Sequence, residues 1–412
     1  MKETLEELLK KYDELCNQNL KIDISRGKPS KEQLDLSNDL LDVLDSDSSF
    51  MDESGNDIRN YGELTGTKEC KSLFSSIFEC DPKNIIIYGN SSINIQFSLI
   101  SNAFIKGING CTPWSKIDKI KWLCPVPGYD RHFSICEYFG IEMINIPMDE
   151  NGPDMDMVEE YIKDSAVKGI WCVPIYSNPT GISFSDEVVN RFAKMKPAAK
   201  DFRIFWDLAY AVHHLYNGHN DKILNLLKEA EKYNNQDNVY MFASFSKITF
   251  AGASVSALAA SDKNIKEIAD ALKYQIISYD KINQIRHAKY FKDFDSLNNH
   301  MKKHAEIIRP KFDLFMHALE EIKDISWFTK PNGGYFISLF VKEGTASKVV
   351  ERCKSCGLIL TDAGCAYPYH KDPFDSHIRI APTYLGLEDI KKACEILVTS
   401  VKIEYLLKNK PL

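Results

Sequence analysis

Four polar residues of this sequence lie at the ends of apolar runs or inside one. Together they offer an amide, a carboxylate, an amine and a guanidinium. Asn178, Asp207 and Lys247 each follow a strand-like run, and the carboxyl ends of strands in an open α/β sheet are where ligand groups collect. Arg379 lies inside the apolar run 377–381, where an unpaired guanidinium would be costly. Each residue alone also fits a turn, a helix cap or a surface charge, so their joint order is what indicates a functional site.

The elements that would position these residues follow from the apolar pattern. Strand-like and helical segments alternate through the middle of the chain, which predicts a mostly parallel sheet covered by helices on both faces. The expected strands are 85–88, 120–124, 141–146, 169–174, 203–206, 239–243 and 255–260, and the expected helices are 91–105, 129–139, 155–163 and 185–195.

A second region follows with a different pattern. A helix at 304–322 precedes a strand at 335–340, a helix at 345–356, a strand at 377–381 and a helix at 387–406, which predicts a smaller α+β domain. We assign 45–295 to a large domain, and 1–44 together with 296–412 to a small one.

Composition excludes several classes of protein. The 412 residues carry a net charge of −7, which argues against a generic nucleic-acid or anionic-membrane partner. No run approaches the roughly 18 apolar residues of a membrane span, and the charged start lacks a secretion signal. Eleven scattered cysteines indicate reduced thiols and a cytoplasmic protein. Dinucleotide, P-loop, nucleophile-elbow and zinc motifs are not matched, so we expect no metal.

Taken together, the polar segments resemble a known family. RGKP at 26–29, GNSS at 89–92, PGYDRHF at 127–133 and SFSKITFAG at 244–252 are similar to fold-type I pyridoxal-phosphate enzymes of aminotransferase class I/II, and within them to the MocR-like aspartate aminotransferase subgroup. The resemblance covers residues 22–400. It implies the fold-type I architecture, pyridoxal 5'-phosphate as the cofactor, and a homodimer with shared active sites.

The resemblance also implies roles for individual residues. Lys247 matches the Schiff-base lysine, whose amine bonds the cofactor and then moves a proton. Asp207 matches the acid that pairs with the protonated pyridine nitrogen, while Tyr210 and Asn178 match partners of the ring's phenolic oxygen. Arg379 matches the arginine that binds the substrate α-carboxylate, whose two coplanar oxygens suit a guanidinium.

The implied phosphate site combines helix N-terminal N–H groups with hydroxyls. It is expected to include Asn90, Ser91, Ser92, Ser244 and Ser246. Tyr61 matches a tyrosine that the partner subunit lends to the phosphate.

On the substrate side, Gly27 matches a glycine near the substrate carboxylate, with Arg26 beside it. Tyr129 is the candidate for the aromatic ring that stacks on the cofactor. The chain departs from the family at 253–256, where Ala-Ser-Val-Ser replaces a phosphate-binding arginine, so hydroxyls or N–H groups must substitute.

The expected reaction transfers the amino group of an amino acid, with aspartate as donor and 2-oxoglutarate as acceptor. A second substrate carboxylate needs a second cation, and Arg26, Lys28 and Arg131 are the candidates. A β-lyase or decarboxylase would use much the same residues. An effector-sensing regulator is disfavoured because RGKP begins at Arg26, which leaves no room for a preceding DNA-binding domain. A degenerate scaffold without cofactor is disfavoured because the four key residue types are present.

Overall fold

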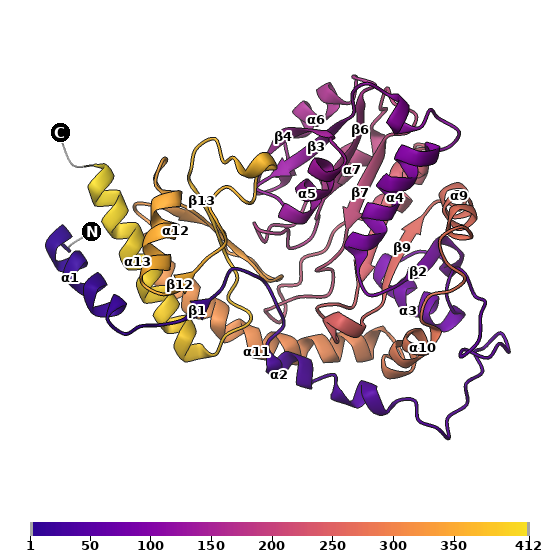
Figure 1. The fold of residues 1–412 in the computed structure, drawn as a ribbon, viewed down its shortest axis with the longest axis horizontal. Coiled ribbons are helices and arrows are strands. Elements are labelled where there is room, and N and C mark those ends of the chain that lie inside the picture. Colours follow the sequence, from indigo (N-terminus) through magenta and orange to yellow (C-terminus); the bar gives the residue numbers. More distant parts are fainter. Residues whose placement is uncertain (1–2, 410–412) are drawn as a thin grey trace.

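All seven expected strands lie in one eight-stranded sheet of the structure, a computed structural model that describes residues 3–409 (Figure 1). Its order is β2-β9-β8-β7-β6-β3-β4-β5. The strands are β2 (Ile85–Tyr88), β3 (Lys121–Val126), β4 (Glu142–Asp149), β5 (Gly152–Pro153), β6 (Val167–Cys172), β7 (Arg203–Asp207), β8 (Val239–Ser244) and β9 (Ser256–Ala260).

The expected mostly parallel sheet is confirmed. Strands β4, β3, β6, β7 and β8 run parallel to one another, which brings their carboxyl ends to one edge. β9 is antiparallel to both β2 and β8, and the short β5 is antiparallel to β4. Asp207 is the last residue of β7, and Lys247 follows the end of β8 by three residues, so the parallel pairing places both beyond the same edge.

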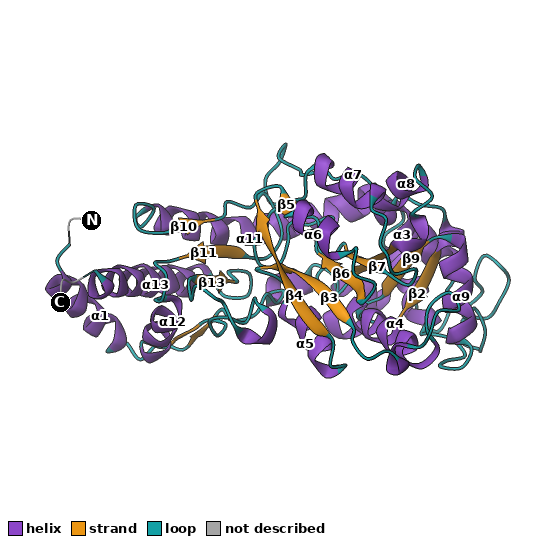
Figure 2. Ribbon diagram, turned by 90° about the horizontal axis from the view of Figure 1, so that it is seen from above, coloured by secondary structure: helices purple, strands orange, loops and turns teal. Residues whose placement is uncertain are grey.

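Neighbouring residues of each strand point to opposite faces, and the sheet therefore has two apolar cores. Trp206 belongs to the core that α3 (Lys68–Phe78), α6 (Met155–Tyr161), α7 (Asp186–Lys194) and α8 (Leu226–Glu231) cover. Phe205 belongs to the other core, under α4 (Ser92–Lys106), α5 (Asp130–Tyr138) and α9 (Asp262–Leu272). Figure 2 shows the sheet edge-on between these layers.

The second region is built around a three-stranded antiparallel sheet. Its order is β10 (Trp327–Phe328), β11 (Ile337–Phe340) and β13 (His377–Ile380), with Arg379 paired to Ser338 across the register. Helices α12 (Ala346–Ser355) and α13 (Leu387–Lys408) pack there. The N-terminal helix α1 (Leu5–Cys16) lies on α13, and β1 (Ile22–Asp23) pairs with β12 (Leu358–Ile359) (Figure 1).

One long helix joins the two regions. α11 (Phe294–Glu320) begins ten residues before the expected helix at 304–322, because Asp293 and Ser296 form a capping box there. It packs against α3, against α2 (Lys31–Asp35), whose Gln33 contacts His304, and against α13, and α10 (Lys281–Tyr290) precedes it. The proposed boundary at residues 295 and 296 falls within its first turn, and we keep the division into 45–295 and the remainder as a proposal.

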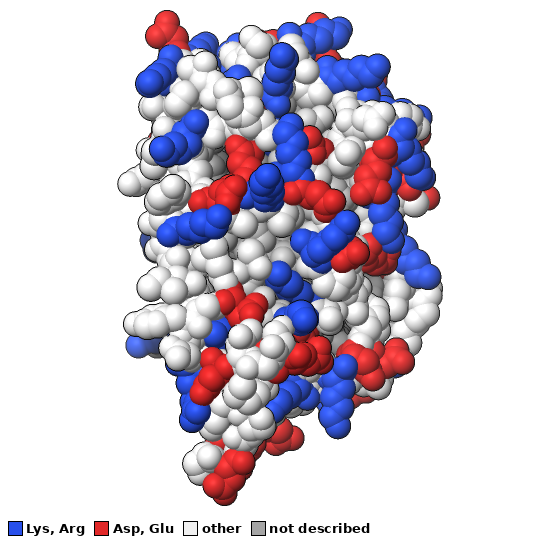
Figure 3. Space-filling model, turned by 90° about the vertical axis from the view of Figure 1, so that its right-hand side faces the viewer, with Lys and Arg blue, Asp and Glu red and all other residues white. Residues whose placement is uncertain are grey.

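The exterior carries charges of both signs. On the face shown in Figure 3, lysine and arginine side chains lie interspersed with acidic ones. Within residues 3–409, no helix combines the length and the apolar character that a membrane crossing requires.

Candidate active site

Lys247 lies in a tight turn that follows β8. The backbone of this turn is held by the bond from the Phe245 N–H to the Val255 carbonyl, and the Ile248 N–H donates back to the Phe245 carbonyl. Lys247 Nζ sits 4.8 Å from the centroid of the Tyr210 ring. Burial lowers the pKa of the Lys247 amine from its usual value, and the charge of Asp207 opposes that shift. The amine is therefore more readily neutral than an exposed lysine.

The two carboxylate oxygens of Asp207 differ in their hydrogen-bond partners. Its Oδ2 accepts a hydrogen bond from Gln96 Nε2 at 2.8 Å and lies 3.5 Å from His132 Nε2. Its Oδ1 is buried and has no partner among the described residues. A buried carboxylate oxygen without a donor is costly, so Oδ1 fits a ligand that brings an N–H group.

Asn178 also has a buried side-chain oxygen without a hydrogen-bond partner in the described part of the chain. Its side chain is buried, and its Oδ1 has no partner among residues 3–409. Asn178 lines one small cavity together with Tyr129, His132 and Trp171. His132 stacks on Trp171 with centroids 4.4 Å apart, and Tyr129 meets His132 edge-on at 4.9 Å. Burial raises the pKa of Tyr129 to about 12. These unpaired polar atoms and rings fit the pyridoxal phosphate ring that the sequence resemblance implies.

The expected phosphate cradle forms where α4 begins. Ser91 is the N-cap residue of α4 and makes no side-chain cap bond. The first N–H groups of the helix have no intrahelical acceptor, so they can bind an anion. Ser246 Oγ donates to the Asn90 carbonyl at 2.7 Å and accepts from Ser244 Oγ at 3.0 Å, which joins the Lys247 turn to the start of α4. Ser92 is the first residue of α4.

Segment 253–256, which replaces the family's arginine, stabilises the backbone next to this cradle. Ser256 Oγ donates to the Gly89 carbonyl at 2.7 Å, and Ser254 Oγ bonds to the Val255 carbonyl. Asn283 on α10 donates to the Ala253 and Ser254 carbonyls. Segment 253–256 therefore holds the loop before α4 in place, and its hydroxyls are engaged with backbone carbonyls.

Arg379 lies across the site in the small sheet. Its side chain is 5% exposed and stacks 5.2 Å from the centroid of Phe336. Nε and Nη2 donate to Thr361 Oγ1 at 3.3 and 3.1 Å, and Nη2 also donates to the Ser25 carbonyl at 3.3 Å. Nη1 donates to Asp130 Oδ1 at 3.0 Å.

The RGKP segment runs beside this arginine. A Cβ on Gly27 would approach Phe336 Cζ to 2.6 Å, so the absence of a side chain lets the segment lie against the ring that supports Arg379. Arg26 and Lys28 are exposed, and Lys28 Nζ lies 5.1 Å from the Tyr384 ring centroid. Arg131 is also exposed.

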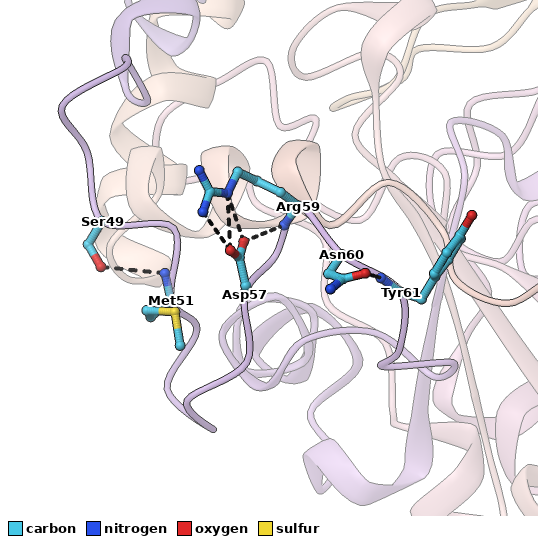
Figure 4. Close-up of polar contacts among 6 residues, drawn as sticks. All are labelled: Ser49, Met51, Asp57, Arg59, Asn60 and Tyr61. Atoms are coloured by element: carbon cyan, nitrogen blue, oxygen red, sulfur yellow. Dashed lines mark hydrogen bonds and ion pairs between the residues drawn. The ribbon is translucent and has the colours of Figure 1, made fainter.

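Tyr61 is the site candidate that stands apart. Its side chain is 76% exposed, and its backbone carbonyl accepts a hydrogen bond from Lys281 Nζ at 3.3 Å. Figure 4 shows the Tyr61 ring pointing away from the ion pair between Arg59 and Asp57 on the same loop. Within one chain, the structure thus joins Lys247 to Tyr210, Ser246 to Asn90, and Arg379 to the segment before Arg26, and it leaves Tyr61 exposed.

Several residues that make contacts at the site were not predicted from the sequence. Gln96 is fully buried in the apolar helix α4, and a lone amide among apolar residues is the signal that could have flagged it. His132 and Asp130 fall inside the PGYDRHF segment without an assigned role. Thr361 carries no local signal, since only the pairing of β1 with β12 brings its loop to Arg379.

Comparison with known proteins gives consistent results. The family described as aspartate amino-transferase matches residues 1–409. An aspartate aminotransferase of Corynebacterium glutamicum is 42% identical over 400 residues, covering 96% of this chain and 92% of that protein. The crystal structure of an aspartate transaminase of that species has a TM-score of 0.95 at 41% identity, covering 98% of this chain and 96% of the other.

A more distant structure shares the fold. Kynurenine aminotransferase of Pyrococcus horikoshii, solved in complex with PMP, has a TM-score of 0.77 at 18% identity, covering 100% of this chain and 96% of the other.

Proposed function

Because this chain belongs to the aspartate aminotransferase family, it is a pyridoxal-phosphate-dependent aminotransferase, and we propose that its donor is aspartate and its acceptor is 2-oxoglutarate. The observation that carries the proposal is the buried Arg379 guanidinium. It contacts Asp130 on α5 and the carbonyl of Ser25, the residue before Arg26. Its planar N–H groups suit an α-carboxylate.

When bound, pyridoxal phosphate supplies an aldehyde that bonds to amino groups and a ring that accepts the electrons released at the substrate Cα. We assign Lys247 Nζ to carry the proton to and from that carbon, and the lowered pKa of its amine favours the neutral form that accepts it. Asp207 Oδ1 would hold the proton on the ring nitrogen, with Gln96 keeping the carboxylate oriented.

The remaining proposed residues orient the cofactor. Asn178 and Tyr210 would bond to the phenolic oxygen, and Tyr129 would cover the ring. The phosphate would lie on the α4 N-terminus, where Asn90, Ser91, Ser92, Ser244 and Ser246 gather. We further propose a homodimer in which Tyr61 of one subunit completes the phosphate site of the other, and its 76% exposure supports that role.

We also propose a cytoplasmic location. The eleven cysteines are free thiols in the structure, and eight of them are buried, which suits a reducing compartment.

For the distal carboxylate of aspartate we propose Arg26. It follows Ser25, whose carbonyl contacts Arg379 Nη2 at 3.3 Å, so the two cations flank one short stretch of backbone. Lys28 is engaged over the Tyr384 ring, which makes it a suitable control.

The test compares donors with 2-oxoglutarate as acceptor. Arg26→Gln should lower kcat/KM for aspartate by about fivefold, because Arg26 is exposed and an ion pair at an exposed site is worth about 1 kcal/mol. Activity with alanine should change little, and Lys28→Gln should affect neither donor. A wild-type enzyme that prefers aromatic or aliphatic donors to aspartate and glutamate would refute the aspartate assignment.

A further inference from the structure

The guanidinium of Arg379 is held on almost all sides by the protein itself. Of its five N–H bonds, Thr361 Oγ1 takes two, the Ser25 carbonyl takes one and Asp130 Oδ1 takes one. One N–H bond is left uncommitted. A carboxylate that binds through two parallel hydrogen bonds must therefore take over at least one donor that a protein group now holds.

Asp130 is the charged group among these three acceptors. The hydroxyl of Thr361 and the carbonyl of Ser25 are neutral, and Thr361 Oγ1 also donates to that carbonyl, so these two groups form one connected support. Asp130 reaches Arg379 from the first turn of α5, 249 residues away in sequence. It presents the same group as a substrate, a carboxylate with one negative charge.

The two partners differ in their access to water. Arg379 is 5% exposed, whereas the Asp130 side chain is 28% exposed. A buried guanidinium without an anion is costly, while a carboxylate near the surface regains hydration when its partner is taken away. Exchange of Asp130 for another carboxylate is therefore cheaper than exchange of the neutral supports.

We propose that Asp130 is an affinity-determining residue that occupies Arg379 in the substrate-free enzyme and is displaced by the substrate α-carboxylate. This inference rests on the proposed function in one respect, the assignment of Arg379 to that carboxylate. Asp130 keeps the buried guanidinium paired between turnovers, and it lowers the apparent affinity for every carboxylate ligand by competing for Nη1. It acts on binding through Arg379.

The experiment measures binding of unreactive carboxylates to the cofactor-loaded enzyme by calorimetry at fixed salt and pH. Succinate and butyrate serve as probes because both have four carbons, but they carry two carboxylates and one. In Asp130→Asn, both should bind about tenfold more tightly, because a partly exposed charge pair no longer competes. Asp130→Ser places neither a carboxylate nor an amide beside Arg379, and it should shift both affinities in the same direction.

Asp362→Asn is the matched control. Asp362 lies next to Thr361 and is exposed, and the described part of the chain records no ion pair for it. The same loss of charge there should change both affinities by less than about twofold, as expected for a solvated surface charge.

A cycle with Arg379→Gln separates the possible failures. If Arg379→Gln leaves butyrate affinity unchanged, the assignment of Arg379 itself is wrong. If Arg379→Gln abolishes binding while Asp130→Asn and Asp130→Ser leave it unchanged or weaker, then Asp130 orients the arginine and the displacement proposal is overturned. Equal binding of succinate and butyrate by the wild type would refute the aspartate proposal and leave the role of Asp130 standing.

Discussion

Asp207 and Lys247 are buried side chains whose surroundings suit the proton chemistry that we propose for them. One Asp207 oxygen is satisfied by Gln96 at 2.8 Å, and the other is buried without a described partner. Lys247 is desolvated, which lowers the pKa of its amine, and the Asp207 charge moderates that effect. The two residues thus prepare an acceptor for an N–H group and an amine that is more readily neutral.

The first expectation at this scale is that the cofactor bonds to Lys247. Borohydride reduction of the loaded protein followed by peptide mapping should place the label there, and Lys247→Ala should take up none. Lys168 serves as an internal control, since its Nζ is paired with Asp201 at 2.7 Å in a buried contact. A label on another lysine in the wild type would refute the assignment.

A second expectation concerns the acid. Asp207→Ala removes the group proposed to keep the ring nitrogen protonated, and the loss of one charge-assisted bond should weaken cofactor binding by about 1.5–3 kcal/mol. Turnover at saturating cofactor should fall much further, because electron withdrawal by the ring is impaired. Steady-state rates and cofactor titration report the two effects separately, and near-normal turnover would contradict the role.

At the scale of elements, buried histidines of α11 contact the turn that carries Lys247. His300 Nε2 lies 3.0 Å from the Ile248 carbonyl, one residue after Lys247, and His304 Nε2 lies 3.1 Å from His300 Nε2. Gln33 of α2 contacts His304 Nδ1 at 3.1 Å and donates to Tyr335 Oη at 2.9 Å. The long helix therefore links the N-terminal segment and the small sheet to the backbone of the lysine turn.

This arrangement predicts an acid-sensitive fold. Burial lowers the pKa of His304 from 6.5 to about 3, so between these values the unfolded chain binds a proton that the folded chain does not. The free energy of unfolding then falls as pH falls below about 6.5, by up to about 1.4 kcal/mol per pH unit for each such group. His377 and His287, with pKa values of about 3 and about 4, act in the same direction.

Urea denaturation of the protein between pH 5 and pH 7 measures this dependence. His304→Gln should reduce the slope of unfolding free energy against pH by about 1.4 kcal/mol per unit below pH 6, whatever it does to absolute stability. The exposed His219 offers a control, and His219→Gln should leave the slope as it is. An unchanged slope in His304→Gln would show that this histidine is protonated equally in both states.

At the scale of the whole molecule, the loop that carries Tyr61 lies at the end of the large sheet remote from α13 (Figure 1). Several of its side-chain contacts are local, such as Arg59 to Asp57 and the Tyr61 N–H to Asn60 Oδ1 (Figure 4), and Lys281 on α10 donates to the Tyr61 carbonyl. Large exposed apolar side chains include Tyr61, Met51, Tyr274 and Ile277. In the homodimer that we propose, a second copy of the chain would cover some of these side chains and would bring Tyr61 to a phosphate site.

Subunit complementation tests that assembly. Lys247→Ala and Tyr61→Ala chains should each be inactive alone, and mixing them should restore activity, because one hybrid site per heterodimer keeps both residues. Tyr138→Ala, which removes an exposed tyrosine from α5, provides a control that should stay active alone. Heterodimers that form but recover no activity would contradict the shared site.

The sequence by itself determined seven strands of the large sheet in their order, several of the helices between them, and the residues at the ends of β7 and β8, whereas helices such as Lys68–Phe78 and Asp262–Leu272 were not predicted. Continuous apolar runs and helical periodicity are local properties. The strand Arg203–Asp207, buried along its whole length, and the helix Asp186–Lys194 therefore lie within two residues of their expected bounds. Parallel pairing then leaves Asp207 and Lys247 at one edge. The roles proposed for Asn178 and Arg379 rested on family resemblance rather than on periodicity.

The tertiary structure decided which side chains meet. Gln96 reaches Asp207 across 111 residues, and Asp130 reaches Arg379 across 249. The antiparallel direction of β9 and the early start of α11 also emerged only in the structure. Hydrogen bonds between distant residues depend on how whole layers pack, and that geometry leaves no periodic trace in the chain. The partner that holds each functional group was therefore visible only once the sheet, α4, α5 and the small region had come together.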